Sequence, residues 1–371
     1  MVMIKVLTDT TIYIKDGKIA DHGESLVIEK GCYAVPGFID EHTHGGYGID
    51  VMDTDYEGLR NLTNKLPGEG VTAFLTTTMT ASLKKIREAI DNTLKVKNHN
   101  DNNEVDGAEI IGLHLEGPFI NKKYKGAQVE NYILTPDSEI MKELIKHSHN
   151  NIKKVTYAPE LDNKFEFIKC LTNNNIIPSV GHSDGTFSQI EIAVEKGLSS
   201  VTHFHNGQSP HHHREPGVVT AGFVFDELGV EIICDGIHLH KDTIKAVYKI
   251  KGREKIILIT DSMEAKGLKD GEYKLGGQKV IKIGNEARLE DTTLAGSCLT
   301  MIDAVKNIIK FTGCTLEDAV TMASTNPARN LNILNRKGSL DKGKDCDIVI
   351  LDNKYNIVKT LCKGKVVFEN R

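Results

Sequence analysis

Seven ionisable side chains stand where short apolar segments of this chain give way to polar or glycine-containing turns: His42, His44, Glu116, His182, His203, His238 and Asp261. Neutral imidazole and carboxylate groups are suitable ligands for Zn²⁺, Fe²⁺, Mn²⁺ and Co²⁺. A single residue, Thr43, separates His42 from His44, so in a strand both histidine side chains lie on the same face. Burying the whole set without a metal ion or a substrate would cost on the order of several kcal/mol. The set therefore predicts a divalent metal centre.

The stretch VTHFHNGQSPHHHREPG, residues 201–217, contains five histidines and one arginine. A metal site, an anion site and a histidine-rich surface loop all fit this composition. Arg214 can make two parallel hydrogen bonds to a phosphate group, although a lone arginine is more often part of a surface ion pair. The stretch by itself leaves the three interpretations open.

The segments that carry these residues alternate with helix-like stretches. Eight strand candidates are residues 38–44, 71–77, 108–116, 154–160, 176–183, 199–206, 231–238 and 255–261. Repeated β-α units imply parallel strands, and eight of them favour an α/β fold closed into a TIM-like (β/α)8 barrel. An open doubly wound sheet is the alternative, but no GxGxxG motif follows the first strand and no P-loop pattern occurs. A barrel would gather the ionisable side chains at its C-terminal mouth, where barrel enzymes have their active sites.

The two ends of the chain have a different pattern from the middle. Residues 1–35 contain β-branched runs with a turn at Asp16-Gly17, which is typical of a hairpin. Residues 338–371 contain two or three further strands with a Lys-Gly turn. Since each end is too small to fold alone, we expect the two to form one small β-domain, with residues 36–337 as the barrel between them.

The composition excludes several classes of protein. Among 371 residues, 46 Lys and Arg stand against 51 Asp and Glu, and no basic patch of the kind that nucleic acid binding requires stands out. No apolar run approaches the roughly 18 residues of a membrane span, and the N-terminus lacks a signal-peptide pattern. Seven scattered cysteines without a CxxC pair predict free thiols in a reducing compartment. We therefore expect a cytoplasmic protein with no nucleic acid or membrane partner.

Two segments, PGFIDEHTHG (36–45) and STNPARNLNILNRKGSLDKGKDCDIVILD (324–352), resemble the segments that open and close the barrel in the amidohydrolase superfamily. Further segments are similar to its branch of amino-sugar phosphate deacetylases, in the same order: GLHLEGPFIN, VGHSD, VTHFHN…SPHHHREPGVV, CDGIHLH, TDSMEAKGLKDGEYKLGG and LAGSCLTM. The HxH or NPA motif alone is weak, whereas the EGP, HHREPG, DGIH and LAGS segments together are specific. The resemblance implies a β-sandwich built from both termini beside the barrel, and a homodimer.

The resemblance also implies a set of metal ligands. Glu116, His182 and His203 match the ligands of the primary ion, while His42 and His44 match those of a second ion that some members lack. Because this chain keeps both histidines, two divalent ions per subunit are expected, chosen from Zn, Fe(II), Mn and Co. No lysine ends the fourth strand, so Glu116 is expected to bridge them.

The activity implied by the resemblance is hydrolysis of N-acetyl-D-glucosamine 6-phosphate to D-glucosamine 6-phosphate and acetate by metal-activated water. Asp261 matches the aspartate that acts as general base and then as general acid, and His238 matches a residue near the amide carbonyl. Asn206, Gly207 and Arg214 match contacts to the phosphate. The full set that matches substrate contacts is Ala127, Gln128, Asn206, Gly207, Arg214, Asp235, Gly236, Ile237, His238, Leu294, Ala295 and Gly296.

Two positions near the expected sugar depart from the family pattern. NGQ (206–208) stands where NAM is usual, and Gln128 stands where a histidine is usual. These departures leave the galacto epimer, N-acetylgalactosamine 6-phosphate, as an alternative substrate. A cyclic amidase or deaminase of the superfamily and a non-catalytic sugar-phosphate sensor are further alternatives, but a sensor would have lost a ligand or the aspartate, and this chain keeps them all.

Overall fold

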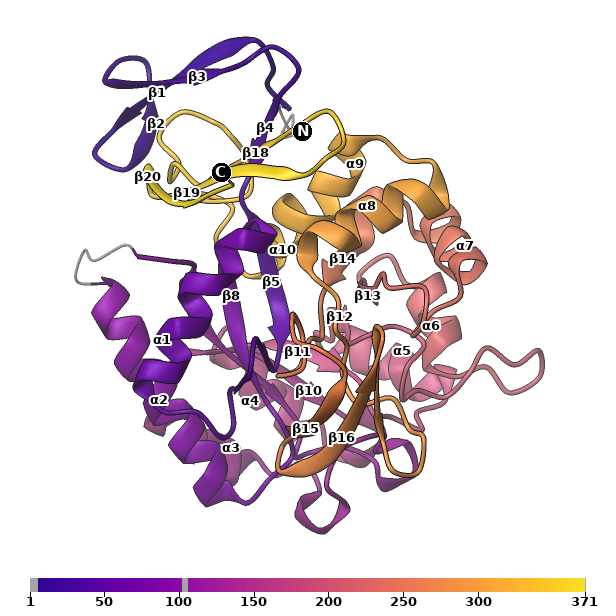
Figure 1. Cartoon of the computed structure of the whole chain (residues 1–371). Helices are drawn as coiled ribbons and strands as arrows, with labels where there is room; N and C mark the ends of the chain where they lie inside the picture. Colours follow the sequence, from indigo (N-terminus) through magenta and orange to yellow (C-terminus); the bar gives the residue numbers. More distant parts are fainter. Residues whose placement is uncertain (1–5, 102–105, 371) are drawn as a thin grey trace.

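The computed structural model describes residues 6–101 and 106–370 (Figure 1). Its centre is an eight-stranded parallel sheet in the order β14-β13-β12-β11-β10-β9-β8-β5. The strands are β5 (Phe38–Thr43), β8 (Val71–Thr78), β9 (Glu109–Glu116), β10 (Ile152–Tyr157), β11 (Ile177–Val180), β12 (Ser200–Val201), β13 (Gly229–Ile233) and β14 (Ile256–Ile259). Each of the eight predicted segments overlaps one of these strands, and the predicted (β/α)8 barrel is confirmed.

The barrel closes where the end of β14 meets β5. The backbone N–H of Asp261 donates to the carbonyl oxygen of His42 at 2.8 Å, and Thr260 Oγ1 donates to Asp40 Oδ2 at 2.6 Å. Because these bonds join the last strand to the first, they place Asp261 beside His42, although the two are far apart in the sequence.

Helices cover the outside of the barrel (Figure 1). They are α1 (Tyr56–Lys65), α2 (Leu83–Asp101), α3 (Ser138–His147), α4 (Glu166–Asn173), α5 (Phe187–Glu195), α6 (Val218–Val224), α7 (Lys241–Lys251), α8 (Met301–Thr312), α9 (Leu316–Val320) and α10 (Asn326–Asn330). Their apolar faces turn inward, as in α3, where Met141, Leu144 and Ile145 are buried at helical spacing. Side-chain caps define helix starts: Thr186 and Gln189 form a reciprocal capping box at α5.

The two ends of the chain form two further sheets. Strands β1 (Thr10–Lys15), β2 (Lys18–Ala20) and β3 (Glu24–Ile28) form one sheet, and β4 (Tyr33–Pro36), β18 (Ile348–Leu351), β19 (Ile357–Cys362) and β20 (Lys365–Glu369) form the other. Apolar residues of both, such as Ile12, Ile28, Ile348 and Leu361, share one core. Figure 1 shows these two sheets together on the side of the barrel where β5 begins. The predicted sandwich of N- and C-terminal strands is confirmed.

A three-stranded antiparallel sheet was not expected from the sequence. It consists of β15 (Gly271–Leu275), β16 (Gln278–Ile283) and β17 (Glu286–Leu289), inserted after the last barrel strand. A two-residue pair, β6 (Gly45–Gly46) with β7 (Ile49–Asp50), follows the first barrel strand. The insertion supplies part of the wall of the cavity described below.

All seven cysteines are free thiols, as predicted. Over residues 6–101 and 106–370, no helix combines the length and the apolar character that a membrane crossing demands.

Candidate metal centre at the mouth of the barrel

Two groups of ligand-type side chains lie side by side where the barrel strands end. One group is Glu116, His182 and His203, and the other is His42, His44 and Asp261. Within each group the possible ligand atoms lie within 4.8 Å of one another, and all six residues are buried. The structure thus brings together the six residues that the sequence singled out for metal binding and proton transfer.

Glu116 lies between the two groups. Its Oε1 atom is 2.9 Å from His203 Nε2 and 3.2 Å from His182 Nε2. Its Oε2 atom is 3.3 Å from His44 Nε2, on the other side. A carboxylate with one oxygen toward each group has the placement that a bridging ligand requires.

The polar atoms of this centre fit a cation. His42 Nε2 is buried and has no hydrogen-bond partner among the described residues, while it faces Glu116 and Asp261 at 3.4 Å each. The Nε2 atoms of His182 and His203 lie 3.1 Å apart, and His182 Nδ1 faces the Tyr124 carbonyl oxygen at 2.8 Å, so His182 Nε2 carries the lone pair when that ring is neutral. A donor set of imidazole nitrogens and carboxylate oxygens suits Zn²⁺, Fe²⁺, Mn²⁺ or Co²⁺.

Electrostatic coupling shifts the pKa values of Glu116 and His44 toward their charged forms. Burial alone would raise the pKa of Glu116, but His42 and the hydrogen bonds from His182 and His203 hold it well below its usual range. Burial would also lower the pKa of His44, yet its contacts with Asp261 and Glu116 raise it to about 9. Without a metal, a positive His44 imidazole thus offsets part of the negative charge of the two carboxylates, and a divalent ion bound here would replace its proton.

The backbone at three of these residues is in the left-handed region. The φ angles are 48° at His182, 31° at His203 and 48° at Asp261. Non-glycine residues hold this conformation at a cost of about 1–3 kcal/mol, and such residues cluster at functional sites. Strand β12 is shorter than predicted. It ends at Val201, so His203 lies in the turn that follows the strand and not in the strand itself.

Two glycines allow neighbouring loops to approach the centre. A Cβ atom on Gly207 would lie 3.0 Å from His182 Nδ1, and one on Gly296 would lie 3.1 Å from the Asp261 carbonyl oxygen. Both have positive φ angles, 58° and 63°. The Asp261 carbonyl also accepts from the Ser297 N–H at 2.7 Å, so the LAGS loop holds the backbone of Asp261.

A cavity of about 380 Å³ opens over the two groups. Its floor and walls include His44, Glu116, His182, His203 and Asp261, whereas His42 lies beneath the floor. The predicted substrate-binding residues that line it are Ala127, Gln128, Asn206, Gly207, His238, Leu294 and Gly296. The cavity has the size of small-molecule sites, which are typically about 300–1,000 Å³.

Five predicted substrate-binding residues do not line this cavity: Arg214, Asp235, Gly236, Ile237 and Ala295. Asp235 instead supports His238, because its Oδ2 is 2.6 Å from His238 Nδ1 and its Oδ1 accepts from the backbone N–H of His238 at 2.9 Å. Arg214 is exposed in the loop between β12 and α6, and Ala295 is fully buried.

Gln128, which departs from the family pattern, is tied to the centre. Its Nε2 donates to Glu116 Oε2 at 2.7 Å, and its Oε1 accepts from the Thr80 N–H at 2.7 Å. The amide therefore orients the oxygen of Glu116 that faces His44.

Several residues at this site were missed from the sequence. Arg288 at the end of the inserted sheet lines the cavity, together with Thr292 and Thr293. Beneath the centre, Lys154 and Glu231 are fully buried inside the barrel. For Glu231 the signal was a charged residue within the otherwise apolar strand GVEII, since a barrel interior tolerates a charge only when it is paired.

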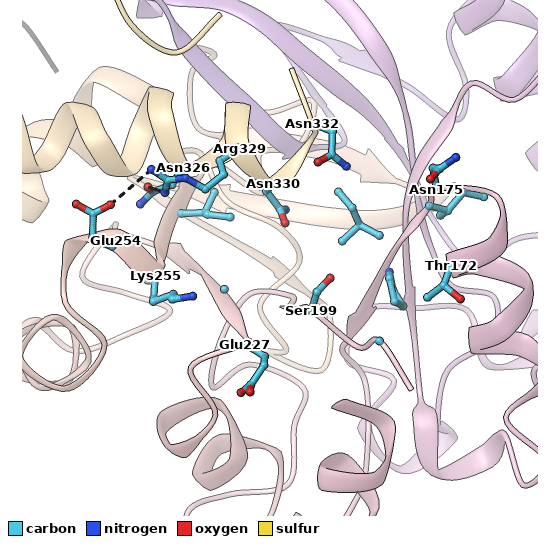
Figure 2. Close-up of a pocket in the computed structure, with 16 residues that line it drawn as sticks. Thr172, Asn175, Ser199, Glu227, Glu254, Lys255, Asn326, Arg329, Asn330 and Asn332 are labelled. Atoms are coloured by element: carbon cyan, nitrogen blue, oxygen red, sulfur yellow. Dashed lines mark hydrogen bonds and ion pairs between the residues drawn. The ribbon is translucent and has the colours of Figure 1, made fainter. Parts of the chain in front are cut away.

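A second cavity, of about 410 Å³, lies at the opposite end of the barrel, where β11 and β13 begin (Figure 2). Its wall contains Asn175, Asn326, Asn330 and Asn332, and Arg329 contacts Glu254 at 3.6 Å. None of the metal-type groups found within the described residues lies there. The chemistry thus concentrates at the mouth where the strands end.

Comparisons with known proteins agree with this geometry. The model of the Amidohydrolase family matches residues 33–367. The N-acetylglucosamine-6-phosphate deacetylase of Bacillus subtilis (strain 168) is 40% identical over 373 residues, covering 98% of this chain and 94% of the relative. The crystal structure of the Thermotoga maritima N-acetylglucosamine-6-phosphate deacetylase has a TM-score of 0.89 at 35% identity, covering 99% of this chain and 100% of that one.

A further solved structure contains a ligand. It is an aspartate-to-alanine mutant of N-acetyl-D-glucosamine-6-phosphate deacetylase from Mycobacterium smegmatis, in complex with N-acetyl-D-glucosamine-6-phosphate. It has a TM-score of 0.88 at 27% identity and covers 95% of this chain and 93% of that one. The similarity seen in short motifs thus extends over the whole fold.

Proposed function

This chain belongs to the amidohydrolase family, and on that basis we propose that it hydrolyses N-acetyl-D-glucosamine 6-phosphate to D-glucosamine 6-phosphate and acetate. The observation that carries the proposal is the cavity whose floor is made by two adjoining groups of metal-type side chains, one of them containing Asp261. The relative from B. subtilis and both solved structures carry the gluco name, so the galacto epimer is not favoured.

We assign Glu116, His182 and His203 to one divalent ion, and His42 and His44 to a second, with Glu116 shared. Bound there, a divalent metal would lower the pKa of water toward about 7 and polarise the acetamide carbonyl. The nitrogen and oxygen donors are compatible with Zn, Fe(II), Mn or Co.

Asp261 is the proposed general base and acid. Its carboxylate lines the cavity, and contacts with His42 and His44 outweigh burial and keep its pKa below the usual value. It can therefore accept a proton from the attacking water and return it to the nitrogen of the leaving amine. The expulsion of that amine breaks the C–N bond and leaves acetate.

His238 is proposed to face the acetamide carbonyl. Its Nδ1 is bonded to Asp235, so Nε2 is the nitrogen available to the cavity that the ring lines. Burial would lower the pKa of His238, but the bond to Asp235 raises it, which favours an imidazole that donates to the carbonyl oxygen.

The sugar phosphate would occupy the outer part of the cavity. Asn206 and Gly207 line the cavity, and Arg288 supplies a guanidinium to its wall. Arg214 remains a predicted phosphate contact; in a single chain it lies on an exposed loop. Leu294, Gly296 and Ala127 would contact the remainder of the substrate.

Two further features belong to this proposal. The seven free thiols support a cytoplasmic location, because such cysteines are typical of reducing compartments. A homodimer, which the sequence motifs suggested, is checked by light scattering of the purified protein.

The test is acetate release from N-acetylglucosamine 6-phosphate and from its galacto epimer, measured side by side. The apoprotein is loaded in turn with Zn²⁺, Fe²⁺, Mn²⁺ and Co²⁺. We expect efficient turnover of the gluco substrate. A preference for the galacto form would make Gln128 and the NGQ turn specificity determinants, and no turnover of either would overturn the proposal.

A further inference from the structure

Three charged side chains lie inside the barrel beneath the metal-type groups, and the proposed reaction uses none of them. They are Glu41 on β5, Lys154 on β10 and Glu231 on β13, and each is fully buried. The Lys154 ammonium is 2.7 Å from Glu41 Oε1 and also bonds to Glu231 Oε1. Asn330 Nδ2 donates to both oxygens of Glu41, at 2.9 and 3.0 Å. Every charge in this cluster therefore has a partner, as buried charges require.

The second oxygen of Glu231 reaches both groups of metal-type residues. Glu231 Oε2 lies 3.0 Å from His42 Nδ1 and 3.0 Å from the backbone N–H of His203. His42 belongs to one group, and His203 belongs to the other. One buried carboxylate oxygen thus connects a histidine ring of the first barrel strand with the strained turn that follows β12.

These contacts decide which nitrogen of His42 is available to a metal. Glu231 faces an ammonium group and the His203 N–H, so only its ionised form offers acceptors to all its neighbours. A carboxylate accepts and does not donate, so His42 Nδ1 carries the hydrogen. In the neutral form of His42, the form that can bind a metal, Nε2 then keeps its lone pair, directed toward the space between Glu116 and Asp261, each 3.4 Å away.

An alternative is that Glu231 itself holds an ion, since His42, His114 and Glu231 also lie within reach of one another. One contact disfavours this. The Lys154 ammonium contacts Glu231 directly. A cation at that point would lie beside another cation in the barrel interior, where repulsion between like charges is strong.

We propose that Glu231, balanced by Lys154, is a positioning residue that fixes the tautomer and orientation of His42 and anchors the turn carrying His203 for metal binding. The proposal rests on the metal centre of the proposed function. Partners of this kind orient ligand histidines in metalloproteins, and their loss typically costs about 10–100-fold in metal affinity.

The test measures Zn²⁺ affinity of the chelator-treated full chain by competition with a chromophoric chelator. Glu231→Gln keeps the size of the side chain but replaces one acceptor oxygen with an NH₂ group. We expect Zn²⁺ affinity about 10–100-fold below wild type.

Glu69→Gln is the matched control. Glu69 is also buried, is 2.7 Å from the Lys266 ammonium, and accepts from Tyr47 Oη at 2.7 Å. It contacts none of the proposed ligands, so this variant loses a comparable buried carboxylate while keeping wild-type Zn²⁺ affinity.

Glu231→Asp provides a second variant in case the glutamine does not fold, which circular dichroism would show. It retains the charge beside Lys154 but is one methylene shorter, so we expect a smaller loss of affinity in the same direction. Wild-type affinity in the folded Glu231 variants would overturn the positioning role. Failure of the wild-type chain to bind Zn²⁺ would instead overturn the metal centre, so the two outcomes are distinct.

Discussion

His182 and His203 face one another across the mouth of the barrel, with their Nε2 atoms 3.1 Å apart and Glu116 Oε1 within 3.2 Å of both. The residues come from the ends of different strands and both have positive φ angles. A shared cation would satisfy both nitrogens and the carboxylate at once.

His203→Ala should therefore remove one metal site. We expect the affinity for one ion to fall more than about 100-fold. Loss of a residue that contacts a ligand but not the metal typically lowers affinity about 10–100-fold, and loss of a ligand itself should lower it further. Metal content after dialysis, measured by elemental analysis, checks this. His147→Ala is the control, because His147 lies on α3 in an ion pair with Asp91, away from the cavity. Unchanged metal content in His203→Ala would contradict the assignment.

Asp261→Asn should keep the metal and the substrate but lose most of the turnover. An amide cannot accept the proton from water, and removal of a general base typically lowers kcat by about 10²–10⁴-fold. The check is steady-state acetate release together with metal analysis. The control is Asp242→Asn, at an exposed position of α7, which should behave as wild type. Full activity of Asp261→Asn would exclude it as the base.

Arg288→Met should raise KM for the phosphorylated substrate and change kcat little, because a guanidinium distant from the reacting bond contributes binding to ground state and transition state alike. Turnover of unphosphorylated N-acetylglucosamine should not change. The same comparison for Arg214→Met tests the predicted contact from the exposed loop. A variant with the same KM as wild type would exclude that arginine from phosphate binding.

Glu109→Gln should destabilise the protein at neutral pH but much less in acid. Burial by itself would raise the pKa of Glu109, yet Lys337 and Arg336 hold it well below the ordinary value of 4.5. A carboxylate with a lower pKa in the folded state adds stability that is complete above the unfolded pKa and is lost as pH falls toward the folded one. Breaking this partly buried ion-pair network should cost about 1–3 kcal/mol at pH 7.

Urea unfolding at pH 7 and at pH 3 measures that difference. The difference in free energy of unfolding between wild type and Glu109→Gln should be smaller at pH 3, because protonation of Glu109 then removes part of the stability that its ionised form contributes. Glu272→Gln removes an exposed ion pair with Lys279 and should change the free energy of unfolding little at either pH. An equal gap at both pH values would show that the ionic contacts of Glu109 do not stabilise the fold.

Local sequence patterns were sufficient for the barrel and for six residues of the centre. Strand alternation put His42 and His44 on one face, and the repeated β-α units put Glu116, His182, His203 and Asp261 at the same end of a parallel barrel. The shared strand face and the shared end of the barrel follow from short-range periodicity and from the order of the elements along the chain, and both can be read directly from the sequence.

Contacts across the barrel were decided only by the tertiary structure. The bond between Glu231 and His42 and the placement of Asp261 beside His42 depend on strand register and on barrel closure, which no local pattern specifies. Arg288 reaches the cavity on an inserted sheet, while Arg214, Asp235 and Ala295 lie off its wall. The sequence alone determined which side chains could do the chemistry; packing between distant segments decided which of them meet, because side-chain contacts across a closed barrel are set by register and not by periodicity.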